Sequence, residues 1–356
     1  MMPTTRQRIV VAALMIAALH AIAGIASAQT SWGLGVLPNG AIFFCDAGRN
    51  TVWRINPNGE RSAAFTGVTC RAIVSAPNGA VVGEATPSDL SATRGLGIWE
   101  INSVGARVWQ MPPTLTPPTG MWLVRDTSDR QYAWSGTGRR GPKSEILRRD
   151  PLGDTAVFAG GDWGQQDGMA TDAAFGNITG LALAPDGSLV VADSGNIRRI
   201  SRLQRVTTEA QGVVTNSHLG LTAITGLWGR ELGVATDLTG AAVVVDPEAG
   251  RVVHVSREGR ATPIWEPAGF SQRVSGGRWG WRPAGVAMMG STYYVLDEWM
   301  GPALLADLIG SPRVSQVDAQ GHVTRIAAVG NWSVRAAAAA LLLVMISATW
   351  TRVRRT

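Results

Sequence analysis

The sequence predicts an all-β chain, a six-bladed β-propeller that lies between an apolar segment at each end. Three observations carry this prediction. The 356-residue chain is rich in glycine, tryptophan and β-branched residues, it shows no long amphipathic helical period between its ends, and one pattern of strands and turns recurs six times. The recurrence weighs most, because self-similarity at a fixed period is typical of repeat architectures.

Residues 1–28 have the features of a secretory signal peptide. Arg6 and Arg8 precede an apolar run from Ile9 to Leu19, and Ala26-Ser27-Ala28 supplies small residues for signal peptidase. An uncleaved anchor is the alternative, but the run is short for a membrane span of roughly 20 residues. We therefore expect cleavage after Ala28 and export of the remaining chain.

Residues 332–356 predict a C-terminal transmembrane helix with a basic tail. The stretch Ala336–Thr351 carries no charge, tryptophans flank it, and Arg352, Arg354 and Arg355 follow. A buried core helix and a sorting signal that is later removed are the alternatives. By the positive-inside rule the tail stays in the cytoplasm, so we expect the preceding domain in the periplasm or another extracytoplasmic space, anchored in the cytoplasmic membrane.

The net charge of +6 comes from the two terminal segments. Six arginines and no acidic residue lie there, which leaves the domain between them with no formal net charge. Binding of nucleic acid by a basic face needs a positive cluster within the domain. The sequence therefore predicts no nucleic-acid partner.

Six segments of the predicted domain, residues 29–331, share one order of strands and turns. We assign them as blades at residues 32–66, 70–110, 119–158, 176–213, 222–265 and 283–329. Equivalent positions at the end of the second strand recur about every 50 residues, which is the length of a four-stranded blade with its loops. These positions are Asp46, Glu84, Ser135, Asp193, Asp246 and Asp297.

Short turn motifs separate the predicted strands. Asn-Gly or Asp-Gly pairs stand at 39–40, 58–59, 78–79 and 186–187. Such pairs supply the positive φ angles of tight hairpins, so we interpret them as structural. We expect the aspartates that end the second strands to accept backbone N–H groups of the following turn, in preference to binding a metal.

The stretch from Phe158 to Ile200 resembles an NHL repeat. Thr179-Gly180-Leu181-Ala182 matches the innermost strand, Pro185-Asp186-Gly187 the first hairpin, Val190–Asp193 the second strand and Asn196–Ile200 the third. The resemblance is weaker at residues 32–60 and 224–260 and loose elsewhere. It implies a six-bladed propeller of the NHL and SMP-30/gluconolactonase-like kind.

Enzymes of the SMP-30 and gluconolactonase kind hold a divalent cation with Glu, Asn and Asp from the inner strands. The corresponding inner-strand openings of this chain contain no carboxylate; they are Trp32-Gly33, Cys70-Arg71, Thr119-Gly120, Thr179-Gly180, Thr225-Gly226 and Ala284-Gly285. Calcium needs several oxygen ligands. We expect no cofactor, with calcium only if the chain is an enzyme that draws ligands from the second strands: Glu84, Asp193, Asp246 and Asp297.

Peptide-amidating lyases, which also resemble NHL proteins, use zinc bound by histidine. His218, His254 and His322 follow the predicted signal peptide, but they are dispersed and show no paired spacing. The sequence also lacks a Gly-x-Ser-x-Gly elbow and a phosphate-binding loop. No catalytic residue can be assigned from these patterns.

Cys45 and Cys70 are the only two cysteines. In consecutive blades the end of a second strand and the start of the next first strand lie at the same rim, and export permits a disulfide. The sequence leaves open whether the two bond, because a Cα separation of about 5.5 Å is required.

Two functional hypotheses remain. The first is a membrane-tethered extracytoplasmic domain that binds or scaffolds a protein, peptide or glycan at its loop face. Its predicted contacts lie at the rim of strand openings and returning hairpins: Arg71, Arg125, Asp193, Arg198, Asp246 and Trp299. The alternative is a metal-dependent hydrolase or lyase. The missing inner-strand acids favour the first.

Overall fold

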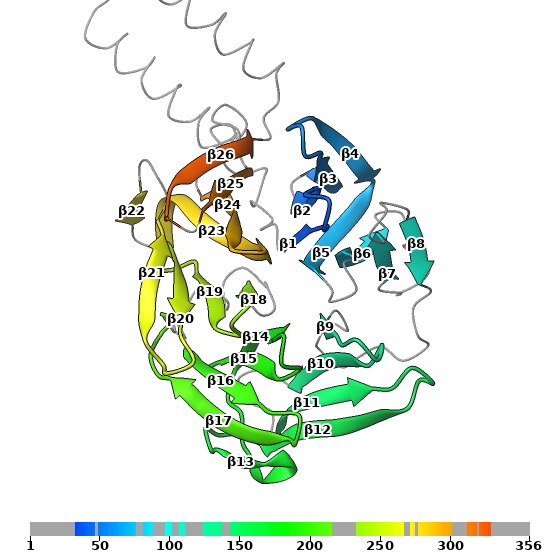
Figure 1. Cartoon of the computed structure of the whole chain (residues 1–356), viewed down its shortest axis with the longest axis vertical. Helices are drawn as coiled ribbons and strands as arrows, with labels where there is room; N and C mark the ends of the chain where they lie inside the picture. Colours follow the sequence, from blue (N-terminus) through cyan, green and yellow to red (C-terminus); the bar gives the residue numbers. More distant parts are fainter. Residues whose placement is uncertain are drawn as a thin grey trace, which may run out of the picture.

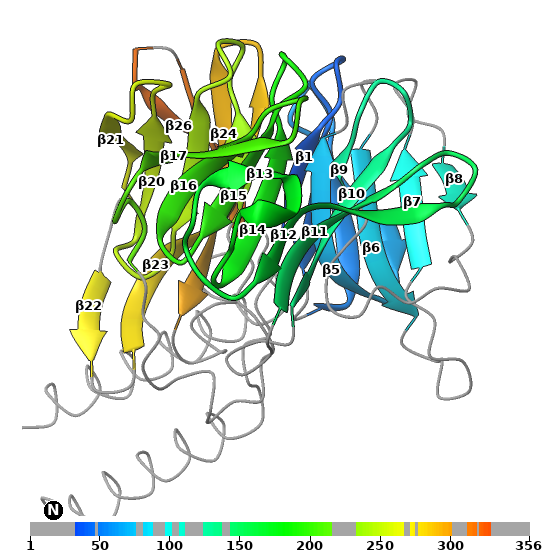
Figure 2. The same ribbon diagram turned by 90° about the horizontal axis from the view of Figure 1, so that it is seen from below.

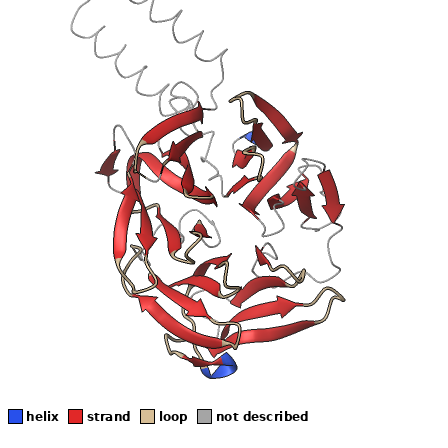
Figure 3. Ribbon diagram, in the orientation of Figure 1, coloured by secondary structure: helices blue, strands red, loops and turns tan. Residues whose placement is uncertain are grey.

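The structure is a computed structural model that describes residues 33–46, 49–75, 81–87, 97–101, 107–110, 124–136, 143–215, 233–266, 271–274, 277–300, 312–318 and 320–328. Almost every regular element in these ranges is a β-strand (Figure 3). The predicted signal peptide and C-terminal helix lie outside the described residues. Within those ranges, no helix has the length and apolar character that a membrane crossing requires.

The strands form six antiparallel sheets, each built from consecutive strands of the chain. The sheets are arranged around a central axis, with one strand of each sheet facing that axis (Figure 1). Figure 2 shows the same sheets from the side, standing next to one another. This radial arrangement is that of a β-propeller, so the prediction of an all-β propeller fold is confirmed.

The first three sheets have four strands each. The first contains β1 (Leu34–Val36), β2 (Ile42–Asp46), β3 (Thr51–Ile55) and β4 (Arg61–Thr66). The second contains β5 (Val68–Ser75), β6 (Val81–Pro87), β7 (Gly97–Ile101) and β8 (Arg107–Gln110). The third contains β9 (Val124–Arg125), β10 (Gln131–Gly136), β11 (Lys143–Arg149) and β12 (Thr155–Asp162).

The last three sheets include two with a fifth strand. The fourth contains β13 (Gly168–Met169), the 3-10 turn η3 (Ala170–Asp172), β14 (Ile178–Leu183), β15 (Leu189–Asp193), β16 (Asn196–Ile200) and β17 (Arg205–Ala210). The fifth contains β18 (Val234–Thr236), β19 (Ala242–Asp246), β20 (Arg251–Val255) and β21 (Ala261–Trp265). The sixth contains β22 (Ser271–Val274), β23 (Gly277–Met289), β24 (Thr292–Met300), β25 (Arg313–Val317) and β26 (Val323–Ala328).

The predicted tight turns have the expected backbone. Gly40, Gly59 and Gly187 adopt φ angles of +83°, +83° and +77°, a region that favours glycine. The residue before the glycine caps all three turns: Asn39 Oδ1 accepts the Ala41 N–H at 3.0 Å, Asn58 Oδ1 accepts the Glu60 N–H at 3.0 Å, and Asp186 Oδ1 accepts the Ser188 N–H at 2.9 Å. The pair at 78–79 lies outside the described residues.

A β-bulge recurs in the inner strand of three sheets. Pairing with the second strand skips Arg71 in β5, Thr179 in β14 and Ala284 in β23. A bulge adds one unpaired residue and bends the strand. This register corrects one predicted equivalence: Ala85, not Glu84, occupies the position of Asp193 and Asp297.

The inner strand of the fifth sheet also differs from the prediction. It is β18, which pairs with β19 through Thr236 and Ala242, so Gly233 is the equivalent of Gly180. The predicted opening Thr225-Gly226 precedes this strand and lies outside the described residues, as does Thr119-Gly120.

Apolar clusters between adjacent sheets hold the ring together. The cluster between the first and sixth sheets joins Leu34 and Phe44 to Tyr294 and Leu296, all at most 5% exposed. In the outer strands the Arg61 guanidinium donates to the Ala328 carbonyl. Side-chain packing therefore joins the first and last sheets of the chain.

Candidate ligand-binding cavity

A cavity of about 860 Å³ lies on the axis of the ring. Residues of all six inner strands line it, from β1, β5, β9, β14, β18 and β23. It continues past these strands to the turns at their C-terminal ends, including Asp126–Ser128, Pro185, Gly187 and Leu238. Its volume lies within the range of small-molecule sites, roughly 300–1,000 Å³.

Glycines bring three inner strands close together on one side of the cavity. A Cβ atom on Gly285 would lie 3.3 Å from the Gly33 backbone, and one on Gly233 would lie 3.1 Å from Gly285 Cα. Side chains at these positions would force β1, β18 and β23 apart. These glycines therefore set the width of the channel here. Their role is to let the strands pack closely.

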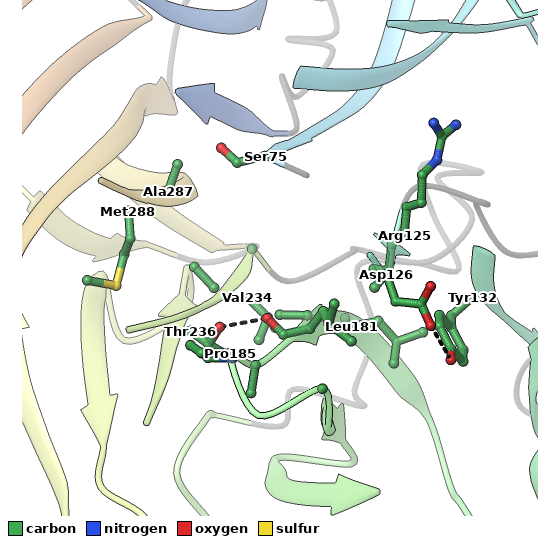
Figure 4. Close-up of a pocket in the computed structure, with 18 of the residues that line it drawn as sticks. Ser75, Arg125, Asp126, Tyr132, Leu181, Pro185, Val234, Thr236, Ala287 and Met288 are labelled. Carbon is green, nitrogen blue, oxygen red and sulfur yellow. Dashed lines mark hydrogen bonds between the residues drawn. The ribbon is translucent and has the colours of Figure 1, made fainter. Parts of the chain in front are cut away.

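A polar cluster from the third sheet stands at the turn end of the cavity. Asp126 Oδ2 accepts a hydrogen bond from Arg130 Nε at 2.7 Å. It also accepts one from the Tyr132 hydroxyl at 3.1 Å (Figure 4). Asp126 Oδ1 accepts the Ser128 and Arg130 N–H groups at 2.9 and 3.0 Å. Asp126 thus fixes the turn and orients two cavity-lining side chains.

These contacts shift the ionisation of the cluster. Burial raises the pKa of Asp126, but hydrogen bonds from Arg130 and Ser128 outweigh it and hold this pKa below its usual value. Burial, with the nearby Asp126 carboxylate, raises the pKa of Tyr132 to about 12. Tyr132 is therefore a neutral hydrogen-bond donor at physiological pH, and Asp126 is ionised.

Four arginines and a single aspartate line the cavity among its described residues. Arg125, which is 5% exposed, lies 3.2 Å from Asp129, and Arg148 lies 3.3 Å from Asp150. The fourth arginine, Arg202, comes from the turn between β16 and β17. The formal charge of the lining is thus positive.

The remaining wall is largely apolar. Thr236 is tied to the wall, since its hydroxyl donates to the Leu183 carbonyl at 2.8 Å (Figure 4). The apolar side chains that line the cavity include Leu34, Ile73, Val124, Trp134, Phe158, Leu181, Val234, Val286 and Met288. An apolar wall with a few polar groups at one end suits an organic ligand.

The aspartates predicted as metal ligands lie elsewhere, each with an arginine of its own sheet. Asp193 Oδ2 accepts Arg198 Nη1 at 3.0 Å, and Asp193 Oδ1 accepts the Gly176 N–H at 2.9 Å. Asp246 lies 3.4 Å from Arg251 Nε and accepts the Ala249 N–H at 3.1 Å. None of these residues lines the cavity.

Asp297 has the most unusual environment of the set. It forms an ion pair with Arg313, whose guanidinium lies 3.5 Å from the centre of the Trp281 ring, and Trp281 packs edge-on against Trp299 at 6.0 Å. Asp297 Oδ1 has no hydrogen-bond partner in the described part of the chain. Burial, opposed by Arg313, raises the pKa of Asp297 to about 7.

The residues predicted as rim contacts lie in different environments. Asp193, Arg198 and Asp246 are 0% exposed and form hydrogen bonds inside the propeller, so no ligand reaches them from the rim. Trp299 is partly buried against Trp281. Of the members of this set whose side chains the structure describes, only Arg125 lines the cavity. For Arg71 and Glu84 the structure gives strand positions on β5 and β6 and no side-chain environment.

Among the described residues, no three His, Cys, Asp or Glu side chains converge as a metal site. His254 Nε2 lies 2.9 Å from Asp237, and His322 Nδ1 lies 3.0 Å from Asp318, in different sheets. Cys45 is disulfide-bonded, and the sequence contains one other cysteine, Cys70.

Apart from Arg125, the polar residues at the turn end of the cavity were not among the predicted contacts. Arg202 and Gln204 come from the fourth sheet. The others belong to the third repeat, where Asp126-Thr-Ser-Asp129-Arg130 replaces the Asn-Gly or Asp-Gly turn of better copies. This difference in sequence could have identified the site. The turn keeps the length of the other turns but has charged residues in place of Asn-Gly or Asp-Gly, and these residues lie beside the axis.

The fold and the cavity together define a β-propeller with an axial cavity. No protein-family model matches the sequence, and no curated protein matches it.

Solved structures similar to the chain include puromycin hydrolase, with a TM-score of 0.51, 16% identity and coverage of 88% of this chain and 55% of that one. A putative gluconolactonase has a TM-score of 0.47, 13% identity and coverage of 76% and 86%. Virginiamycin B lyase from Staphylococcus aureus has a TM-score of 0.43, 12% identity and coverage of 84% of each chain. At these identities the likeness concerns the fold alone.

Proposed function

We propose that this chain is an exported, membrane-tethered, six-bladed propeller of the NHL kind that acts as a binding domain and holds its ligand in the axial cavity. The observation that carries the proposal is the cavity itself: about 860 Å³, lined by all six inner strands, with polar groups gathered at one end. Its ligand is a small organic molecule or one end of a protein, peptide or glycan.

The surroundings of the cavity support a preformed site. Side chains of its walls also pack in the clusters between sheets; for example, Leu181 and Val124 line the cavity and belong to the same buried cluster as Phe175. Asp126 holds the polar end through four hydrogen bonds. A site whose side chains are already fixed loses little conformational entropy when a ligand binds.

A metal-dependent hydrolase or lyase is the alternative. It requires a cation held by several oxygen or nitrogen ligands. The described aspartates of the second strands are engaged with arginines, which opposes this reading. We expect the melting temperature to be unchanged by a chelator or by added calcium or zinc; a rise with either cation would favour the enzyme.

Filling the cavity tests the binding proposal. Ala182 lines the cavity from β14, whereas Ala261 is exposed on the outer strand β21. In a thermal-shift screen of small organic molecules, we expect hits that stabilise the wild type and A261W but not A182W. A ligand at about 100 times its Kd adds roughly 2.7 kcal/mol.

Ser75→Trp, from the opposite wall of the cavity, repeats the test should A182W fold poorly. Stabilisation that persists in folded A182W and S75W would place the ligand outside the cavity. Failure of every compound to stabilise the wild type would refute a small-molecule site.

A further inference from the structure

We propose that the cavity selects an organic anion with an apolar body, and that Arg202 binds the anionic group. The inference rests on the proposed function, because it assumes that the axial cavity holds the ligand. The ligand class is a carboxylate, phosphate or sulfonate on an apolar or aromatic frame.

The first argument is charge. Three of the four lining arginines have an acidic partner on their own sheet: Arg125 with Asp129, Arg130 with Asp126, and Arg148 with Asp150. Arg202 differs, since its guanidinium makes no ion pair or hydrogen bond within the described residues. The positive charge of the lining is therefore concentrated where a ligand can neutralise it.

The second argument is position. The guanidinium of Arg202 lies over Gly187 in the turn between β14 and β15, and a Cβ atom on that glycine would lie 2.6 Å from Nη2 and 2.8 Å from Cζ. The missing side chain makes room for the arginine next to the cavity. Gln204, from the same turn as Arg202, also lines the cavity and adds a neutral polar group.

The third argument is the chemistry of the guanidinium. A planar guanidinium presents paired N–H donors that match carboxylate and phosphate oxygens, and it stays charged at any physiological pH. Beyond Arg202 the wall becomes apolar through Ala184, Leu183 and Leu181 toward the axis. A ligand with its anionic group at Arg202 would place an apolar body along this wall.

The test uses two fluorescent probes that share a frame. 8-Anilino-1-naphthalenesulfonate carries a sulfonate, and N-phenyl-1-naphthylamine is the same ring system without it. We expect wild-type protein to bind the sulfonate at least about tenfold more tightly, as a charge-assisted hydrogen bond allows. Arg202→Gln should abolish this preference and leave the affinity for the neutral probe unchanged.

Arg205→Gln is the matched control. Arg205 is also exposed and lies three residues from Arg202, but it does not line the cavity. Its substitution should leave both affinities unchanged. Raised salt should reduce the preference of the wild type for the sulfonate probe and have little effect on R202Q, because only in the wild type does binding of this probe depend on a charge pair.

The outcomes separate this inference from the proposed function. Equal binding of both probes by the wild type, equal weakening of both by R202Q, or the same loss in R205Q would overturn the role of Arg202. The cavity itself is tested by the neutral probe: its binding should be lost in A182W. If neither probe binds, or A182W binds both as the wild type does, both proposals fail.

Discussion

At the residue scale, the described aspartates that end second strands act as anchors inside the propeller. Asp193 and Asp246 are fully buried, and each joins a turn or loop N–H group to an arginine of the same sheet. The predicted contact with the following turn is present at Asp246, which accepts the Ala249 N–H, whereas the backbone partner of Asp193 is Gly176, which precedes β14. The arginine partners were not predictable, because the pairing depends on how strands align in space.

Arg198→Met should strongly destabilise the protein. Arg198 is buried between Asp193, Asp167 and the Phe175 ring, so its loss leaves the Asp193 carboxylate buried without a cation. We expect a loss of about 3–5 kcal/mol in the free energy of unfolding, measured by urea denaturation.

Arg257→Met is the control, because the Arg257–Asp186 pair is largely exposed and should contribute at most about 1 kcal/mol. Equal losses in the two variants would contradict the assigned role of Arg198.

Asp297 should make stability depend on pH. Its folded pKa is raised by burial to about 7 from an ordinary value of 3.8, so the folded state binds the proton more tightly than the unfolded state. The stabilisation is fully present below about 3.8 and is lost as pH rises toward 7. The urea concentration at the unfolding midpoint of the wild type should therefore decrease as the pH is raised from 5 to 8.

Asp297→Asn should flatten this pH dependence. Asp186→Asn is the control, since hydrogen bonds to Arg257 and Ser188 outweigh burial and lower the pKa of Asp186, which keeps it ionised throughout this range. An unchanged slope in D297N would show that Asp297 does not titrate there.

At the element scale, hairpin turns were predictable and strand registers were not. The turns at Gly40, Gly59 and Gly187 follow from two adjacent residues, whose φ preferences are local. The bulges at Arg71, Thr179 and Ala284 have no such local signature. A shift of one residue in register moves a side chain to the other face of the sheet. Because the bulge could not be predicted, Glu84 was aligned with Asp193 in place of Ala85.

The disulfide of Cys45 should be a measurable part of the stability of the first sheet. Cys45 is 0% exposed in the core between the first two sheets. We expect thermal unfolding of the wild type under reducing conditions to occur at a lower temperature, with a loss of about 2–4 kcal/mol. Cys45→Ala should be insensitive to the reductant, and a wild type equally insensitive to it would argue against the bond.

At the scale of the whole molecule, the six sheets and their radial arrangement agree with the repeat period of about 50 residues. The cavity was not predictable in the same way. Its lining residues come from all six sheets, from Gly33 to Met288, and no pair of neighbouring residues in the sequence identifies it. Only the ring brings them together.

Leu34→Ala should loosen the junction between the first and last sheets. Leu34 is 1% exposed and packs with Tyr294 and Leu296 across that junction. We expect a loss of about 2–5 kcal/mol and faster amide hydrogen exchange in both β1 and β23. Leu189→Ala, in the cluster between the third and fourth sheets, should leave exchange at β1 unchanged. Identical exchange patterns in the two variants would contradict a distinct junction.

The construction of each sheet from consecutive strands also affects the order of assembly during synthesis. No sheet of the described chain borrows a strand from the opposite end, so each can pair its strands as soon as its own segment leaves the ribosome. The contact between Arg61 and Ala328 forms only after the sixth sheet has emerged. Until then the apolar edge of the first sheet around Leu34 and Phe44 has no neighbour, and the nascent protein exposes it to water and to any chaperone that binds such surfaces.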